Sequence, residues 1–132
     1  MTTRAVTFVA VRRLLVIAIG GVLGSLARYV VVLVMGDDDP ASWPWDTLIV
    51  NLVGALTIGI VAASAAVHTR HWVRPFLITG ILGGFTTFSA FALETGTLLD
   101  TGRVTFAASY VLATMAGGLL AVHVGTLIGR PR

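Results

Sequence analysis

Residues Gly80–Phe91 read GILGGFTTFSAF. This stretch lies within an apolar segment that runs approximately over Phe76–Leu99, which is long enough to cross a bilayer as one helix. Glycine and β-branched threonine are poor helix formers, and here Gly83 and Gly84 are closely followed by two threonines. We therefore expect a membrane-spanning helix that is broken near its middle.

The composition of the whole chain is typical of a membrane protein. Of its 132 residues, 56% are apolar and 11% are charged, and the mean hydropathy is +0.93. A soluble domain carries about 25% charged residues, so a water-soluble globule of this composition would lack polar surface. A membrane helix takes ~20 residues, so we expect four spans and no separate soluble domain.

Division of the sequence at its charged and proline-containing stretches predicts an all-α protein that forms a single domain, residues 1–132. The four expected spans run approximately over Leu14–Met35, Thr47–Val67, Phe76–Leu99 and Val104–Ile128. A cleaved signal peptide that ends near Ser25–Ala27 is a second interpretation of the N-terminal part. The apolar pattern resumes at Tyr29, which favours a retained span.

The arginines are unequally distributed between the two ends of the expected bundle. Four spans place both termini on one side, and seven arginines fall there: Arg4, Arg12, Arg13, Arg70, Arg74, Arg130 and Arg132. Outside the membrane, the opposite side carries Arg103 alone. Because arginines that flank spans stay in the cytoplasm, we expect cytoplasmic termini in the cell membrane. The net charge of +3 forms no clustered basic face of the kind that binds nucleic acid.

Enzymatic chemistry finds little support in the sequence. The chain has no cysteine, and His68, His71 and His123 are too scattered to form a metal-ligand set. No serine–histidine–aspartate arrangement, carboxylate pair or glycine-rich phosphate loop is present in the sequence. We therefore expect that the protein is not an enzyme.

Three polar residues interrupt the expected spans. Arg28 either faces a cavity or extends toward the outer headgroups. Asn51 offers N–H donors that could hold a dehydrated anion, or else it forms a hydrogen bond between helices. Glu94, the only glutamate, is either a proton or ion relay or an interfacial residue.

The third span has two interpretations of its own. A break would expose backbone carbonyls able to hold a cation, whereas Gly80 and Gly84 equally suit close packing of small residues between helices. Phe88 and Phe91 lie three apart and share a helical face, as do Tyr110 and Thr114 in the fourth span. Taken alone, these pairs are typical of core or lipid contacts.

Taken together, these motifs resemble the CrcB/Fluc family of fluoride channels over essentially the whole chain. The resemblance is carried by the glycine-rich segment that ends in Arg28-Tyr29, by Thr47–Gly59 with Asn51 and Gly54, and above all by Gly80–Phe91. The chain departs from the usual pattern at Ser25, Ala90 and Thr114, where the changes keep size or hydroxyl chemistry.

The resemblance implies an antiparallel dimer of four-helix subunits with two fluoride pores and one sodium ion (Na⁺) at the dimer centre. Backbone carbonyls of Gly83 and Thr86 from both subunits would hold the sodium ion. The pore residues that the resemblance implies are Asn51, Phe88, Phe91, Ser89, Thr87, Tyr110 and Thr114, with Glu94 near the end of the path and Arg28 near a vestibule. The implied function is passive fluoride export, which reduces fluoride toxicity in the cytoplasm.

Two other classes of membrane protein are also consistent with four short spans. A proton-coupled multidrug exporter resembles this design but carries a glutamate in its first span, where this chain has Arg28. A structural membrane subunit would not require the Gly83–Phe91 block.

The arginine count also bears on the dimer that the resemblance implies. An antiparallel homodimer requires the chain to insert in both orientations, whereas the seven-to-one distribution favours one orientation. We therefore expect a heterodimer with a homologous chain of opposite orientation, or a homodimer where both orientations occur.

Overall fold

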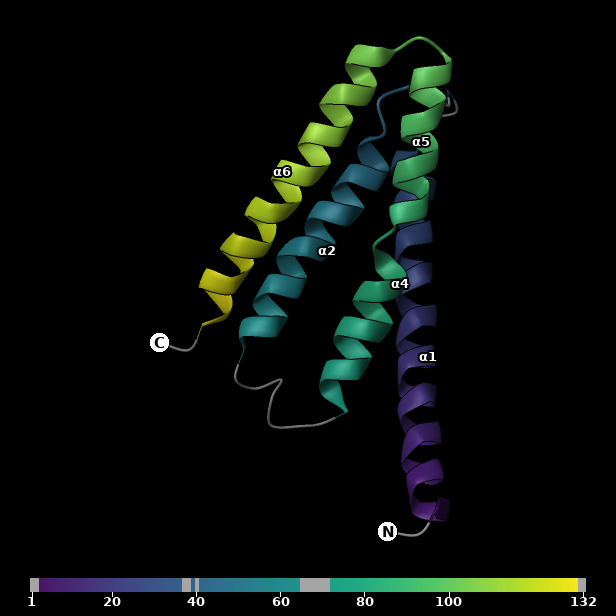
Figure 1. Ribbon diagram of the computed structural model, residues 1–132, viewed down its shortest axis with the longest axis vertical. Helices are drawn as coiled ribbons and strands as arrows, with labels where there is room; N and C mark the ends of the chain where they lie inside the picture. The colour runs from purple at the N-terminus through teal and green to yellow at the C-terminus, as the bar shows by residue number, and fades with distance from the viewer. Residues whose placement is uncertain (1–2, 37–38, 40, 65–71, 131–132) are drawn as a thin grey trace.

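The computed structural model describes residues 3–36, 39, 41–64 and 72–130, and within them the regular structure is entirely helical (Figure 1). Its elements are α1 (Thr3–Met35), α2 (Trp45–Ala63), the π-helical η1 (Pro75–Leu82), α4 (Gly83–Phe85), α5 (Phe88–Asp100) and α6 (Val104–Gly129). Four segments of the described chain are long and apolar enough to cross a membrane: Phe8–Met35, Trp45–Ala63, Pro75–Asp100 and Val104–Gly129. The elements η1, α4 and α5 together form the third of these.

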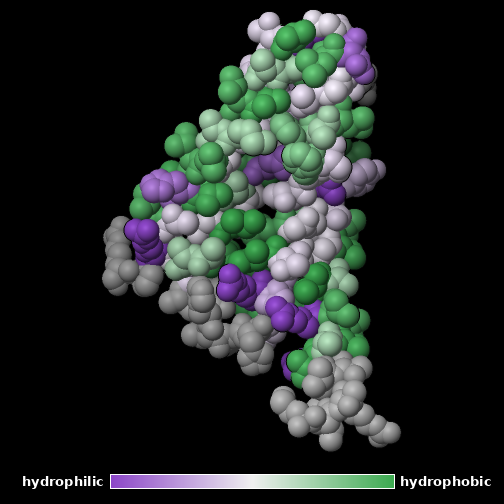
Figure 2. Space-filling model, viewed as in Figure 1, coloured by the Kyte–Doolittle hydropathy of each residue, from purple (hydrophilic) through white to green (hydrophobic). Residues whose placement is uncertain are grey.

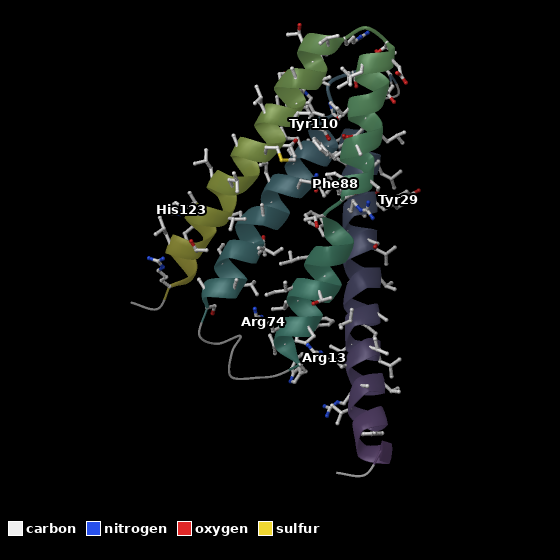
Figure 3. All side chains as sticks on the ribbon, in the orientation of Figure 1. Arg13, Tyr29, Arg74, Phe88, Tyr110 and His123 are labelled. Atoms are coloured by element: carbon white, nitrogen blue, oxygen red, sulfur yellow. The ribbon has the colours of Figure 1, made fainter. Side chains whose placement is uncertain are left out.

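The helices run alternately up and down between two ends of the molecule (Figure 1). One end holds the start of α1, the end of α2, the start of η1 and the end of α6, and Arg13 and Arg74 lie there (Figure 3). At the other end, α5 and α6 are joined by a tight turn in which Gly102 has a positive φ of 75°. The Arg103 amide closes this turn by donating to the Leu98 carbonyl at 2.8 Å.

The helix boundaries extend or shorten the expected spans. Helix α1 begins at Thr3, before the expected Leu14, because Ala5–Val11 is also apolar and the arginines that follow it are good helix formers. Helix α2 already begins at Trp45 and ends at Ala63. The last expected residues of the second span, 65–67, lie outside the described residues.

The first half of the third span has wider turns than an α-helix. Pro75–Leu82 is π-helical, and the Gly83 amide donates to the Ile78 carbonyl, five residues earlier. Single π-helical turns are rare and often occur near functional sites. The sequence pattern does not predict these π-helical turns.

Glycines bring the helices together in two close pairs. Gly20 of α1 faces η1 so closely that a Cβ there would lie 2.6 Å from the Phe76 carbonyl oxygen. A Cβ on Gly84 would likewise collide with the Gly21 carbonyl of α1, and Gly59 of α2 directly faces α6. In membranes, where lipid is as apolar as the helices, such small residues provide the close backbone contact that holds helices together.

The outside of the bundle is largely apolar, and the best-buried core lies toward the end that carries the α5–α6 turn. Figure 2 shows hydrophobic residues spread over the helices, with hydrophilic ones toward the ends and a few midway along the bundle. The core cluster is shared by α2, α5 and α6 and consists of Leu48, Phe91, Leu98, Ala107 and Tyr110. This core fixes the position of α5 after the break.

Candidate functional site

The third span breaks at two threonines, as the sequence predicts. Helix α4 ends at Phe85, and Thr86 and Thr87 are extended, with ψ angles of 157° and 124°, before α5 begins at Phe88. Thr87 caps α5, because its side-chain oxygen accepts from the Ala90 amide at 3.2 Å. The preceding glycines are helical, so they serve the packing of α4 on α1 and the threonines make the break.

Asn51 of α2 binds the extended backbone at the break. Its Oδ1 accepts from the Thr87 amide at 2.9 Å, and its Nδ2 donates to the Thr87 carbonyl at 3.0 Å. One side-chain amide thus replaces the donor and the acceptor that an unbroken helix would have supplied. Because Nδ2 carries two protons, one N–H remains for another acceptor.

The break leaves several backbone carbonyls without their helical donors, and the hydrogen bonds of Asn51 and Thr87 explain two of them. In an unbroken helix the Thr87 amide would donate to the Gly83 carbonyl, but here it donates to Asn51. The Ala90 amide would likewise donate to the Thr86 carbonyl, but here it donates to the Thr87 hydroxyl. Carbonyl oxygens freed in this way suit a hard cation such as sodium. These are the two residues at which the sequence resemblance places that ion.

A second polar group joins three helices around Glu94 of α5. The Thr47 hydroxyl of α2 donates to Oε1 of Glu94 at 2.7 Å, and the Tyr110 hydroxyl of α6 donates to Oε2 at 2.6 Å. Thr47 and Tyr110 are 3% and 0% exposed, so this carboxylate receives donors that water cannot reach freely. Sequence reasoning missed the role of Thr47, although its position one helical turn before Asn51 places both on one face of α2.

Aromatic rings form a continuous series from the end with the α5–α6 turn to the break. Phe88 and Phe91 have ring centroids 5.7 Å apart, and Phe91 and Tyr110 are 5.2 Å apart. Trp43 contacts Tyr110 edge-on at 5.7 Å and donates to the Ser109 hydroxyl at 3.0 Å. Phe91 is 7% exposed, whereas Phe88 is 74% exposed and stands on the outer surface at the break (Figure 3).

A groove of about 230 Å³ lies beside the break between α2, α5 and α6. The residues that line it are Asn51, Thr86, Thr87, Phe88, Phe91, Thr114 and Met115. The Thr114 hydroxyl oxygen is buried and has no hydrogen-bond partner in the described residues. Ser89 joins this site through its hydroxyl, which lies 3.2 Å from that of Thr87. The structure thus brings six of the seven expected pore residues to one place, and Tyr110 adjoins them through Phe91.

A second cavity, of about 370 Å³, lies between α1, α2 and α5. Its lining residues are Ser25, Arg28, Tyr29, Val32, Asp46, Thr47, Val50, Thr87, Ala90 and Glu94. Arg28 therefore faces a cavity, which is one of its two expected settings. Thr87 lines both this cavity and the groove, so both spaces border the break. Within the described part of the chain, no three His, Cys, Asp or Glu side chains are grouped as metal ligands.

These features define an all-helical, multi-pass membrane protein with polar groups gathered at a broken span, an arrangement that channels and transporters use for ion sites. The family described as CrcB-like protein, Camphor Resistance (CrcB), matches residues 15–126. This chain belongs to that family.

Curated relatives match over most of the chain. A protein of Paracoccus denitrificans named fluoride-specific ion channel FluC is 47% identical over 114 residues, which cover 86% of this chain and 91% of the relative. FluC 1 of Mycolicibacterium paratuberculosis is 44% identical over 121 residues, covering 90% and 91%. A Caulobacter FluC is 41% identical over 122 residues, covering 89% and 94%.

The two hydrogen bonds of Asn51 predict the effect of removing its amide. Asn51→Leu keeps the approximate size but leaves the Thr87 N–H and C=O without partners in an apolar interior, at a cost of about 1–3 kcal/mol for each group. We expect a lower melting temperature in detergent and faster amide hydrogen exchange at residues 86–90. The control is Thr57→Val, because the Thr57 hydroxyl donates only within its own helix, to the Val53 carbonyl. Wild-type exchange at the break in Asn51→Leu would contradict the assigned role.

Proposed function

We propose that this protein is a fluoride-selective channel through which fluoride leaves the cell passively, down its electrochemical gradient. The observation that carries the proposal is the groove at the break, where compact donors and two phenylalanine rings lie together. The names of the relatives, fluoride-specific ion channels, support the same function. The multidrug-exporter alternative gains no support, because the first span carries arginine and no glutamate.

The groove offers fluoride what it loses when it leaves water. Fluoride is small and strongly hydrated, so a selective path must replace its water with small, fixed donors. The free N–H of Asn51 and the unpaired hydroxyl of Thr114 are such donors. Aromatic rings carry positive potential at their edges, so the edges of Phe88 and Phe91 can face an anion without binding it tightly.

The pathway is proposed to be completed by a second subunit in an antiparallel dimer. Phe88 is largely exposed, and the groove beside it is open along one side of the chain. A partner packed on this face would cover the ring and enclose the groove, which lipid would otherwise occupy. The freed Gly83 and Thr86 carbonyls lie on the same span, and a sodium ion held there by both subunits would supply positive charge that attracts anions into a medium of low dielectric.

The phenylalanine rings predict a direct test of the pathway. We expect Phe88→Ile and Phe91→Ile to lower fluoride efflux from liposomes by about ten-fold or more, equivalent to a barrier ~1.4 kcal/mol higher, because the positive ring edges are lost. Phe8→Ile is the control, since Phe8 is exposed on α1 far from the break. Chloride and an organic cation should not pass in any variant. Unchanged efflux in both pore variants would refute the assignment.

The sodium site predicts different effects at its two residues. The Thr86 hydroxyl donates to the Leu82 carbonyl at 2.9 Å, so Thr86→Ala leaves the backbone ligand in place and should retain sodium-dependent flux. Gly83 is exposed, and within the chain a Cβ there would meet only the Ile78 carbonyl oxygen, at 3.7 Å. Gly83→Val should therefore fold but block the site.

The measurement is fluoride efflux with sodium replaced by N-methylglucamine on both sides of the membrane. We expect the wild type and Thr86→Ala to lose flux without sodium, and Gly83→Val to be slow in either salt. Full activity of the wild type in sodium-free vesicles would count against the site.

The arginine distribution predicts a single orientation in the membrane. Seven arginines flank the spans on the side that holds both termini, and only Arg103 lies outside the membrane on the opposite side. A reporter fused to either terminus should therefore be found almost entirely in the cytoplasm. The partner in an antiparallel dimer would then be a homologous chain of opposite charge bias. A near-equal mixture of reporter orientations would instead support a homodimer of this chain.

A further inference from the structure

The cavity between α1, α2 and α5 contains one charged residue that the proposed pathway does not use. Arg28 and Glu94 were expected near the path, but Asp46 joins them from the first turn of α2. Asp46 lies directly before Thr47 in the sequence and is partly buried. The cavity therefore combines a cation with two carboxylic acid groups, and these groups oppose one another in their effect on an anion that enters it.

The three charged side chains of the cavity differ in how they are bound. Both oxygens of Glu94 accept hydroxyl protons, from Thr47 and Tyr110. Asp46 and Arg28 form no ion pair with each other, and the one ion pair found among the described residues joins Arg103 to Asp39 at 3.7 Å. The first turn of a helix favours a negative charge, because the helix dipole is positive there. The charge of Asp46 is thus held in place and not cancelled by contact with Arg28.

We propose that Asp46 limits the rate at which fluoride enters the pathway from the end of the molecule that carries the α5–α6 turn. Arg28 attracts an anion into the cavity, and Asp46 opposes that attraction from the neighbouring helix. This inference rests on the proposed channel function and adds to it a charge that sets the entry rate. A fixed charge changes how often an anion arrives, whereas the equilibrium distribution of fluoride is unaffected.

The position of Asp46 makes this effect one-sided. Helix α2 begins at the end opposite Arg13 and Arg74 (Figures 1 and 3). With the arginine-rich end in the cytoplasm, Asp46 faces the outside. Asp46 then lowers net fluoride influx under an inward gradient more than net efflux under an outward gradient of the same size, because local anion depletion acts at the mouth where influx begins. At any one gradient the two one-way fluxes change by the same factor, so the equilibrium is unaffected.

The test is the dependence of fluoride influx on ionic strength in vesicles from cells that express the chain with its proposed partner of opposite orientation, so that every copy of this chain has the same orientation. Asp46→Asn removes the charge at almost constant size. We expect about three-fold faster influx from the Asp46 side at ~10 mM salt, where charges act over about 30 Å, and no difference at ~1 M, where they act over about 3 Å. The quantity compared is the salt ratio, which is influx at low salt divided by influx at high salt. Both values come from one preparation, so the salt ratio does not depend on how much of a variant folds.

The matched control is Asp100→Asn, because Asp100 ends α5 at the same end of the molecule, is exposed and does not line the cavity. This control should change the salt ratio less than Asp46→Asn does, because its charge is exposed to solvent outside the cavity, and Arg28→Gln should change the ratio in the opposite direction. A salt ratio in Asp46→Asn equal to that of wild type, while the wild type conducts fluoride, would overturn this inference alone. A wild type that conducts no fluoride would overturn the channel function as well.

Discussion

The pair of hydrogen bonds between the Asn51 side chain and the Thr87 backbone is the interaction on which this structure depends. Hydrocarbon supplies no partners to a peptide group, so a helix can break inside a membrane only where protein provides them. The Asn side chain carries its acceptor oxygen and its donor nitrogen on separate atoms, so it can bind the N–H and the C=O of one residue at the same time. With these groups satisfied, Thr86 and Thr87 can be extended and α5 can begin afresh, capped by the Thr87 hydroxyl.

The remaining architecture follows from two kinds of contact. Glycines pack α1 against η1 and α4, and other glycines pack α2 against α6, so the bundle consists of two close helix pairs. Hydrogen bonds join the helices at two levels. Asn51 binds Thr87 at the break, and Thr47 and Tyr110 bind Glu94 farther along α5. The groove and the cavity both border the break beside these hydrogen bonds.

The sequence predicted the parts of this arrangement that depend on local composition. Apolar runs located the spans, and the weak helix propensity of adjacent glycines and threonines located the break. Contacts between distant residues could not be predicted in this way: Asn51 and Thr87 lie 36 positions apart, and nothing in either neighbourhood specifies the other. The π-helical turns of Pro75–Leu82 and the place of Asp46 in a cavity likewise arise from packing. Gly80 and Gly84 showed that two competing interpretations, close packing and a nearby break, can both be correct.

The position of Asn51 on the second span also constrains how the protein is made. Chains are synthesised from the N-terminus, so α2 is present before the third span leaves the ribosome, and the partner for the Thr87 backbone is already available. Glu94 differs, because Tyr110 belongs to the last helix and completes its hydrogen bonds only at the end of synthesis. The break can thus form during insertion, whereas locking of α5 must wait for α6. Biogenesis of this small bundle is therefore ordered by the sequence positions of two polar side chains.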